Sequence, residues 1–187
     1  MLWAEYYENE QKEFERAQEM IKANPREAFW HYKLGTVYVS KLDFEEAYKC
    51  CKKAIELDPE GALFHIFMAY LHVFNDSNVK GAVDEIVAAI ELIEEAKDKK
   101  VFNERKWYLT DANQPNGICC PNSQEKITLI ESELEYYLDF VKGGLDMEIA
   151  ESKAAVLRKA GKVAVADKLE DWIVKAKPAS VFLPEFE

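Results

Sequence analysis

Apolar residues recur along most of the chain at the three- and four-residue spacing of amphipathic α-helices. The first such segment, from Leu2 to Ala23, reads as one long helix that ends at Asn24-Pro25. The chain holds only 7 Gly and 6 Pro, which is few for an all-β protein that must turn about every 8–12 residues. The pattern therefore predicts an all-α protein.

Part of this pattern repeats with a period of about 34 residues. The tetrapeptide Ala-Ile-Glu-Leu at 54–57 returns at 89–92, and the proline that closes a helical pattern at Pro25 returns at Pro59. A unit of this length holds two antiparallel helices joined by short turns. The sequence therefore predicts stacked helical hairpins.

The unit from Ala28 to Gly61 carries the small residues that closely packed helices need. Gly35 lies in the middle of its first helix, where it lets a neighbouring helix approach although Gly costs about 1 kcal/mol of helix propensity relative to Ala. Asp43 follows the break between the two helices and is placed to cap the second. Ala47 and Ala54 are small where the second helix crosses its neighbours.

This unit resembles the tetratricopeptide repeat (TPR). Six of the eight positions usually cited for that motif match in register, namely Leu34, Gly35, Tyr38, Ala47, Ala54 and Pro59. Two positions depart from it, because His31 replaces the usual Trp and Cys51 replaces a large apolar residue. The resemblance implies an array of helical hairpins, an alpha-alpha superhelix, that binds other proteins.

A degenerate second copy follows at 62–97. Met68-Ala69 stands where the motif has Leu-Gly, and no proline ends the second helix, which can therefore continue toward Lys100. The domain organisation expected from these features is an N-terminal capping helix over 1–24 followed by TPR-like repeats over 25–100.

The residues that follow, 101–177, are expected to form a C-terminal helical extension that caps the array. A turn-rich loop at 110–123 precedes a helix with a regular apolar stripe. The stripe consists of Ile127, Ile130, Leu134, Tyr137, Leu138 and Val141. Two last helices, over 146–160 and 162–177, form a hairpin that turns at Gly161.

Charge narrows the choice of partner. The chain has 24 basic and 35 acidic residues, which give a net charge of −11. Such a surface is repelled by nucleic-acid phosphates and by anionic lipid, so neither is expected as a partner. No apolar run approaches the roughly 18 residues that span a bilayer, and no secretory signal is recognisable. We expect a cytoplasmic protein whose partner is another protein.

Residue types that carry metal or catalytic chemistry form no recognised motif. Cys50-Cys51 and Cys119-Cys120 are adjacent pairs, whereas zinc ligands usually stand two to four residues apart. His31 and His65 share a repeat position that the family fills with a packing aromatic residue, and we interpret them as packing histidines. Phosphate-binding Gly-rich loops, zinc-protease helices and serine nucleophile elbows are absent from the sequence. We therefore expect no cofactor, no metal and no enzymatic activity.

The resemblance also implies a binding face. In TPR proteins the first helix of each hairpin lines the concave side, and ligand contacts concentrate at its second, fifth, ninth, twelfth and thirteenth positions. These positions correspond to Phe29, Tyr32, Thr36, Val39 and Ser40 in the first repeat and to Leu63, Ile66, Tyr70, Val73 and Phe74 in the second. The implied groove is apolar and aromatic, which suits an amphipathic helix or an extended apolar peptide.

The same positions argue against one specialised TPR function. Family members that clamp a terminal carboxylate use Lys, Arg and Asn there, and Lys33 is the one plausible cation near them in this chain. The expected function is a non-enzymatic adaptor or scaffold that holds a peptide or helix of a partner protein in an apolar concave groove.

Two alternatives stay open. In the first, the protein is a structural or self-associating homo-oligomeric protein whose groove is filled by its own C-terminal helices. The apolar tail at 178–187, with Val181, Phe182, Leu183 and Phe186, could also occupy the groove in cis. In the second alternative, the loop that carries Cys119-Cys120 serves as a thiol-based sensor or enzyme site.

Overall fold

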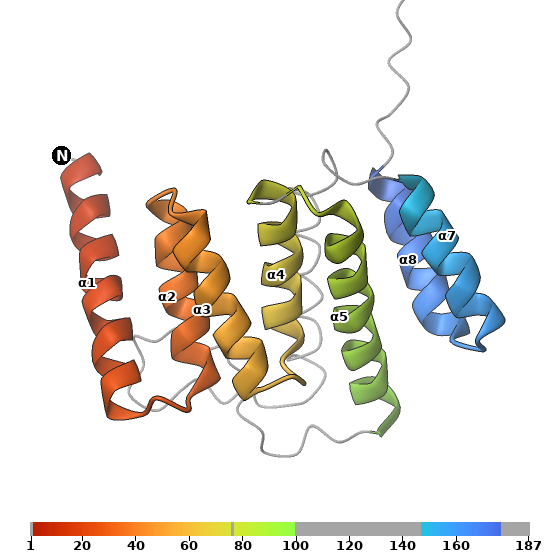
Figure 1. The fold of residues 1–187 in the computed structure, drawn as a ribbon, viewed down its shortest axis with the longest axis horizontal. Coiled ribbons are helices and arrows are strands. Elements are labelled where there is room, and N and C mark those ends of the chain that lie inside the picture. Colours follow the sequence, from red (N-terminus) through yellow and green to blue (C-terminus); the bar gives the residue numbers. More distant parts are fainter. Residues whose placement is uncertain (1, 76, 100–146, 177–187) are drawn as a thin grey trace, which may run out of the picture.

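The computed structural model describes residues 2–75, 77–99 and 147–176. The described helices are α1 (Leu2–Ala23), α2 (Ala28–Ser40), α3 (Phe44–Leu57), α4 (Ala62–Phe74), α5 (Val79–Lys99), α7 (Met147–Lys159) and α8 (Val163–Ala176). Figure 1 shows them as a row of helices in which hairpin partners run in opposite directions. All regular secondary structure in these residues is α-helical, which confirms the all-α prediction.

Several helix ends lie where the sequence predicts them. The Asp43 carboxylate accepts a hydrogen bond of 3.2 Å from the backbone N–H of Glu46, so Asp43 caps α3. Without a proline after its last apolar residues, α5 continues to Lys99. Gly161 adopts a φ of 81°, a left-handed conformation that Gly enters without a steric penalty, and α7 and α8 turn there.

The helices pack in pairs around two apolar cores. The N-terminal core is formed by residues of α1, α2, α3 and α4, and the C-terminal core by residues of α4, α5, α7 and α8. The helix α4 belongs to both, since Phe64 and Phe67 lie in the first core and Ile66 and Ala69 in the second. A helix that is apolar on all sides must be buried on all sides, and nine of the 13 residues of α4 are buried.

The hairpin of α7 and α8 covers the side of α5 that faces away from α4 (Figure 1). Leu169 and Ala166 of α8 are fully buried in the C-terminal core. Two ion pairs join the hairpin to α5 at the surface, from Lys162 in the turn before α8 to Glu91 and from Lys168 of α8 to Glu94. Within the described residues, no helix combines the length and the apolar character that a membrane span requires.

Gly35 lies where α2 packs closely against both α3 and α4. A Cβ atom on it would lie 3.1 Å from Cε1 of Phe67 in α4 and 3.3 Å from the carbonyl oxygen of Ala47 in α3. The role predicted for this glycine, to let the next helix come close, is confirmed by these distances.

Gly35→Ala is expected to destabilise the protein although it improves helix propensity. Overpacking costs about 1–3 kcal/mol, and the propensity gain offsets roughly 1 kcal/mol of it. Because the Phe67 ring is 1% exposed and held between other rings, it has little room to yield. Urea unfolding followed by circular dichroism measures the difference, and an unchanged or higher free energy of unfolding would show that the ring moves aside.

Candidate functional site

The ten residues predicted to line a binding groove differ widely in exposure. Phe29, Tyr32, Leu63 and Ile66 are buried, with 1–8% of each residue exposed. Thr36, Val39, Tyr70 and Val73 are half-buried, and Ser40 and Phe74 are exposed. The last six therefore keep some surface exposed, whereas the first four belong to the two cores.

Aromatic side chains form a continuous series across α2 and α4, which we call the aromatic row. It consists of Phe29, Tyr32, Phe67, Tyr70 and Phe74. Successive ring centroids lie 6.2, 5.3, 6.2 and 4.6 Å apart, within the range in which aromatic pairs attract one another. The row begins in the N-terminal core and ends at Phe74, which is 45% exposed.

Phe67 is the member of this row that the family positions do not predict. Its ring lies between Tyr32 of α2 and Tyr70 of α4 and contacts both. The sequence does contain a signal for it, because Phe67, Tyr70 and Phe74 follow one another at the i, i+3, i+7 spacing of a single helix face.

The polar residues near the row are engaged within the protein. The Thr36 hydroxyl donates to the carbonyl oxygen of Lys33 at 2.8 Å, and the Ser40 hydroxyl contacts both the Val37 carbonyl and the Glu10 carboxylate. The Lys33 ammonium lies 3.9 Å from the Glu13 carboxylate of α1. The cation that a carboxylate clamp would need is thus already paired with a carboxylate of α1.

The three histidines are packed and partnered. The Nε2 atoms of His31 and His65 each lie 3.0 Å from the carbonyl oxygen of the proline that ends the preceding helical pattern, Pro25 and Pro59 respectively. His72 is 7% exposed and packs edge-on against the ring of Tyr48. These contacts hold both rings in place, and the interpretation of His31 and His65 as packing histidines stays a prediction.

The two described cysteines have little nucleophilic character, because a thiol reacts as its thiolate. Burial, together with the charges of Glu46 and Asp43, raises the pKa of Cys50 to about 11. Burial raises the pKa of Cys51 well above its usual value, and its thiol donates to the carbonyl oxygen of Phe64 at 3.3 Å.

The loop with Cys119-Cys120 lies outside the described residues. In the described ranges, no three His, Cys, Asp or Glu side chains come together as metal ligands.

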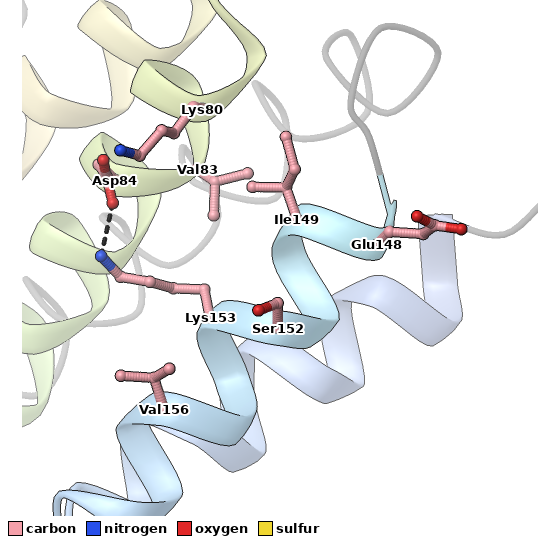
Figure 2. Close-up of a pocket in the computed structure, with 8 residues that line it drawn as sticks. All are labelled: Lys80, Val83, Asp84, Glu148, Ile149, Ser152, Lys153 and Val156. Atoms are coloured by element: carbon pink, nitrogen blue, oxygen red, sulfur yellow. Dashed lines mark hydrogen bonds and ion pairs between the residues drawn. The ribbon is translucent and has the colours of Figure 1, made fainter.

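A crevice of about 460 Å³ lies between α5 and α7, away from the predicted positions. Its lining residues are Lys80, Val83, Asp84, Glu148, Ile149, Ser152, Lys153 and Val156. Figure 2 shows Lys153 of α7 reaching across it to Asp84 of α5, with 2.5 Å between Nζ and Oδ1. This ion pair neutralises both charges and links the C-terminal hairpin to the second repeat.

Comparison with known proteins adds one match. The sequence model of the tetratricopeptide repeat family matches residues 28–60, the segment that forms α2, α3 and the turn after them. No curated protein matches the chain. Residues 28–60 thus match the tetratricopeptide repeat, and in the described part of the chain this repeat lies within an array of antiparallel helical hairpins.

Proposed function

We propose that this protein is a non-enzymatic protein-interaction module that holds an apolar peptide or amphipathic helix of a partner against the exposed end of its aromatic row. Repeats of the matched family generally mediate protein–protein contact, which supports the general role of an interaction module. The more specific proposal rests on the pair Tyr70 and Phe74, whose rings are tilted against each other with their centroids 4.6 Å apart. Tyr70 is half-buried, and Phe74 is 45% exposed.

The buried part of the row supports this role by holding the exposed part in place. Tyr70 stacks on the buried ring of Phe67, with an interplanar angle of 6°. Side chains that are already ordered lose less conformational entropy on binding, so a partner retains more of the free energy of its apolar contacts. Each apolar anchor that the partner buries contributes about 1.5–3 kcal/mol before such losses.

Peptide selection against the full chain tests the proposal. We expect the selected peptides to be apolar or amphipathic, and we expect Phe74→Glu to weaken their binding at least tenfold, because a charge placed against an apolar anchor must be desolvated. Fluorescence anisotropy with labelled peptides gives the dissociation constants, and circular dichroism establishes that the variant is folded. Substitutions at Tyr32 or Ile66 are poor tests, because both side chains are buried and a charge there would unfold the protein.

Val174→Glu is the matched control. Val174 is 70% exposed and lies on α8, at the end of the helical array that is opposite to α1 (Figure 1). The substitution introduces the same charge at an apolar surface position. Because this position lies away from the aromatic row, peptide affinity should stay unchanged. If no selected peptide distinguishes Phe74→Glu from Val174→Glu, the aromatic row is not the binding surface and the proposal fails.

A further inference from the structure

His65 lies between two acceptors that belong to different elements. Its Nδ1 atom is 2.6 Å from the Oε2 atom of Glu85 in α5, and its Nε2 atom is 3.0 Å from the carbonyl oxygen of Pro59, just before α4. The side chains of His65 and Glu85 are 13% and 26% exposed. Water therefore competes weakly for the part-buried contact with Glu85, whereas the contact with the Pro59 carbonyl is exposed.

The protonation state of the ring decides whether both contacts can be hydrogen bonds. A carbonyl oxygen and an ionised carboxylate only accept, and a neutral imidazole has one N–H to donate, whereas an imidazolium has two. We propose that His65 is a proton-dependent clasp, which holds Glu85 and the Pro59 carbonyl together when it is protonated and releases one of them when it is neutral. A neutral ring that releases Glu85 loses the hydrogen bond between α4 and α5, and one that keeps it loses the charge on its donor. In either case the joint between α4 and α5 is tighter in the protonated protein.

The charges around the ring favour the protonated form. Burial by itself lowers the pKa of His65, but the hydrogen bonds to Glu85 and Pro59 and the negative charges of Glu85 and Asp58 outweigh it, so the pKa of His65 is raised. Asp58 belongs to the end of α3 and Glu85 to α5, the two elements that flank α4. The nearby thiol of Cys51, also on α3, has a raised pKa and stays neutral.

The first repeat provides an internal comparison. His31 occupies the same repeat position as His65 and contacts Pro25 as His65 contacts Pro59. The residue equivalent to Glu85 in the first repeat is Cys50, because the Ala-Ile-Glu-Leu tetrapeptides at 54–57 and 89–92 place the two second helices 35 residues apart. A thiol with a pKa of about 11 brings no charge to this position, so the charged clasp is specific to the second repeat.

The sign of the pH dependence follows from the raised pKa. The clasp contributes its full stabilisation below the pKa of histidine in the unfolded chain, about 6.5. This contribution is lost as the pH rises through the higher pKa of His65 in the folded protein.

The test is an NMR titration of the His65 imidazole in the full chain, assigned with the variant His65→Gln. Glu85→Gln should move the His65 titration to lower pH, because it removes the charged acceptor. Asp84→Asn is the matched control, since it changes the adjacent α5 carboxylate, which pairs with Lys153 instead. It should leave the titration in place.

Hydrogen exchange provides a second measurement that does not depend on the titration. After correction for intrinsic rates, protection of the amides around Glu85 should fall between pH 5.5 and pH 8.5 in the wild type, and less so in Glu85→Gln. Equal titration of His65 in wild type and Glu85→Gln would overturn the proposal. Equal shifts in the two amide variants would also overturn it, because they would reflect net charge alone.

Discussion

Phe67→Ala is expected to lower the free energy of unfolding by about 3–5 kcal/mol, the range for removing a buried aromatic side chain. The Phe67 ring is 1% exposed, contacts the rings of Tyr32 and Tyr70, and lies against Gly35. The cavity that alanine leaves is therefore enclosed by side chains of two repeats. Urea denaturation followed by far-ultraviolet circular dichroism measures the loss.

Phe74→Ala is the matched control for this result, because it makes the same chemical change at the exposed end of the same helix face. Its ring is 45% exposed and contacts Tyr70 alone within the row, so much less apolar surface returns to water and the expected loss is well below that of Phe67→Ala. Equal losses in the two variants would contradict the division of the row into a buried anchor and an exposed end.

Leu169→Ala is expected to destabilise the whole array by about 2–5 kcal/mol in a single unfolding transition. Leu169 of α8 is fully buried in the C-terminal core, which also contains residues of α4, α5 and α7. Since α4 belongs to both cores, loss of packing in α8 should be felt in α2 and α3 as well. Hydrogen exchange of amides in α2 should therefore speed up together with those in α8.

The control for this second prediction is Val174→Ala, five residues further along the same helix. Val174 is 70% exposed, so its truncation should change the free energy of unfolding by no more than about 0.5 kcal/mol. Two separate transitions in Leu169→Ala, with unchanged exchange in α2, would contradict the coupling and would make the C-terminal hairpin an independent unit.

Local features of the fold could be predicted from the sequence because single residues determine them. Asp43 caps α3, Gly161 allows the left-handed turn between α7 and α8, and Gly35 allows α3 and α4 to pack closely against α2. The structure contains all three features. The extension of α5 to Lys99 follows in the same way from the lack of a proline. The division into a cap, repeats, extension and tail stays a prediction, since much of the extension and the whole tail lie outside the described residues.

The binding face was harder to predict, because family positions state which way a side chain points on its helix and not what packs against it. Tyr32 and Ile66 occupy binding positions, yet each is buried by neighbouring helices. The partner of His65 was missed for a similar reason. Glu85 is 20 residues away on another helix, and no local spacing marks one acid among the 35 acidic residues of the chain.

The sharing of α4 between two cores has a consequence for the order of events during synthesis. Its N-terminal-core face can pack as soon as α2 and α3 have left the ribosome, whereas Ile66 and Ala69 must wait for α5, α7 and α8. In that interval a helix without a single Asp, Glu, Lys or Arg presents its second apolar face to solvent or to a chaperone. A chain stopped near residue 75 would keep that surface bare permanently, which makes α4 the segment through which truncated copies would aggregate.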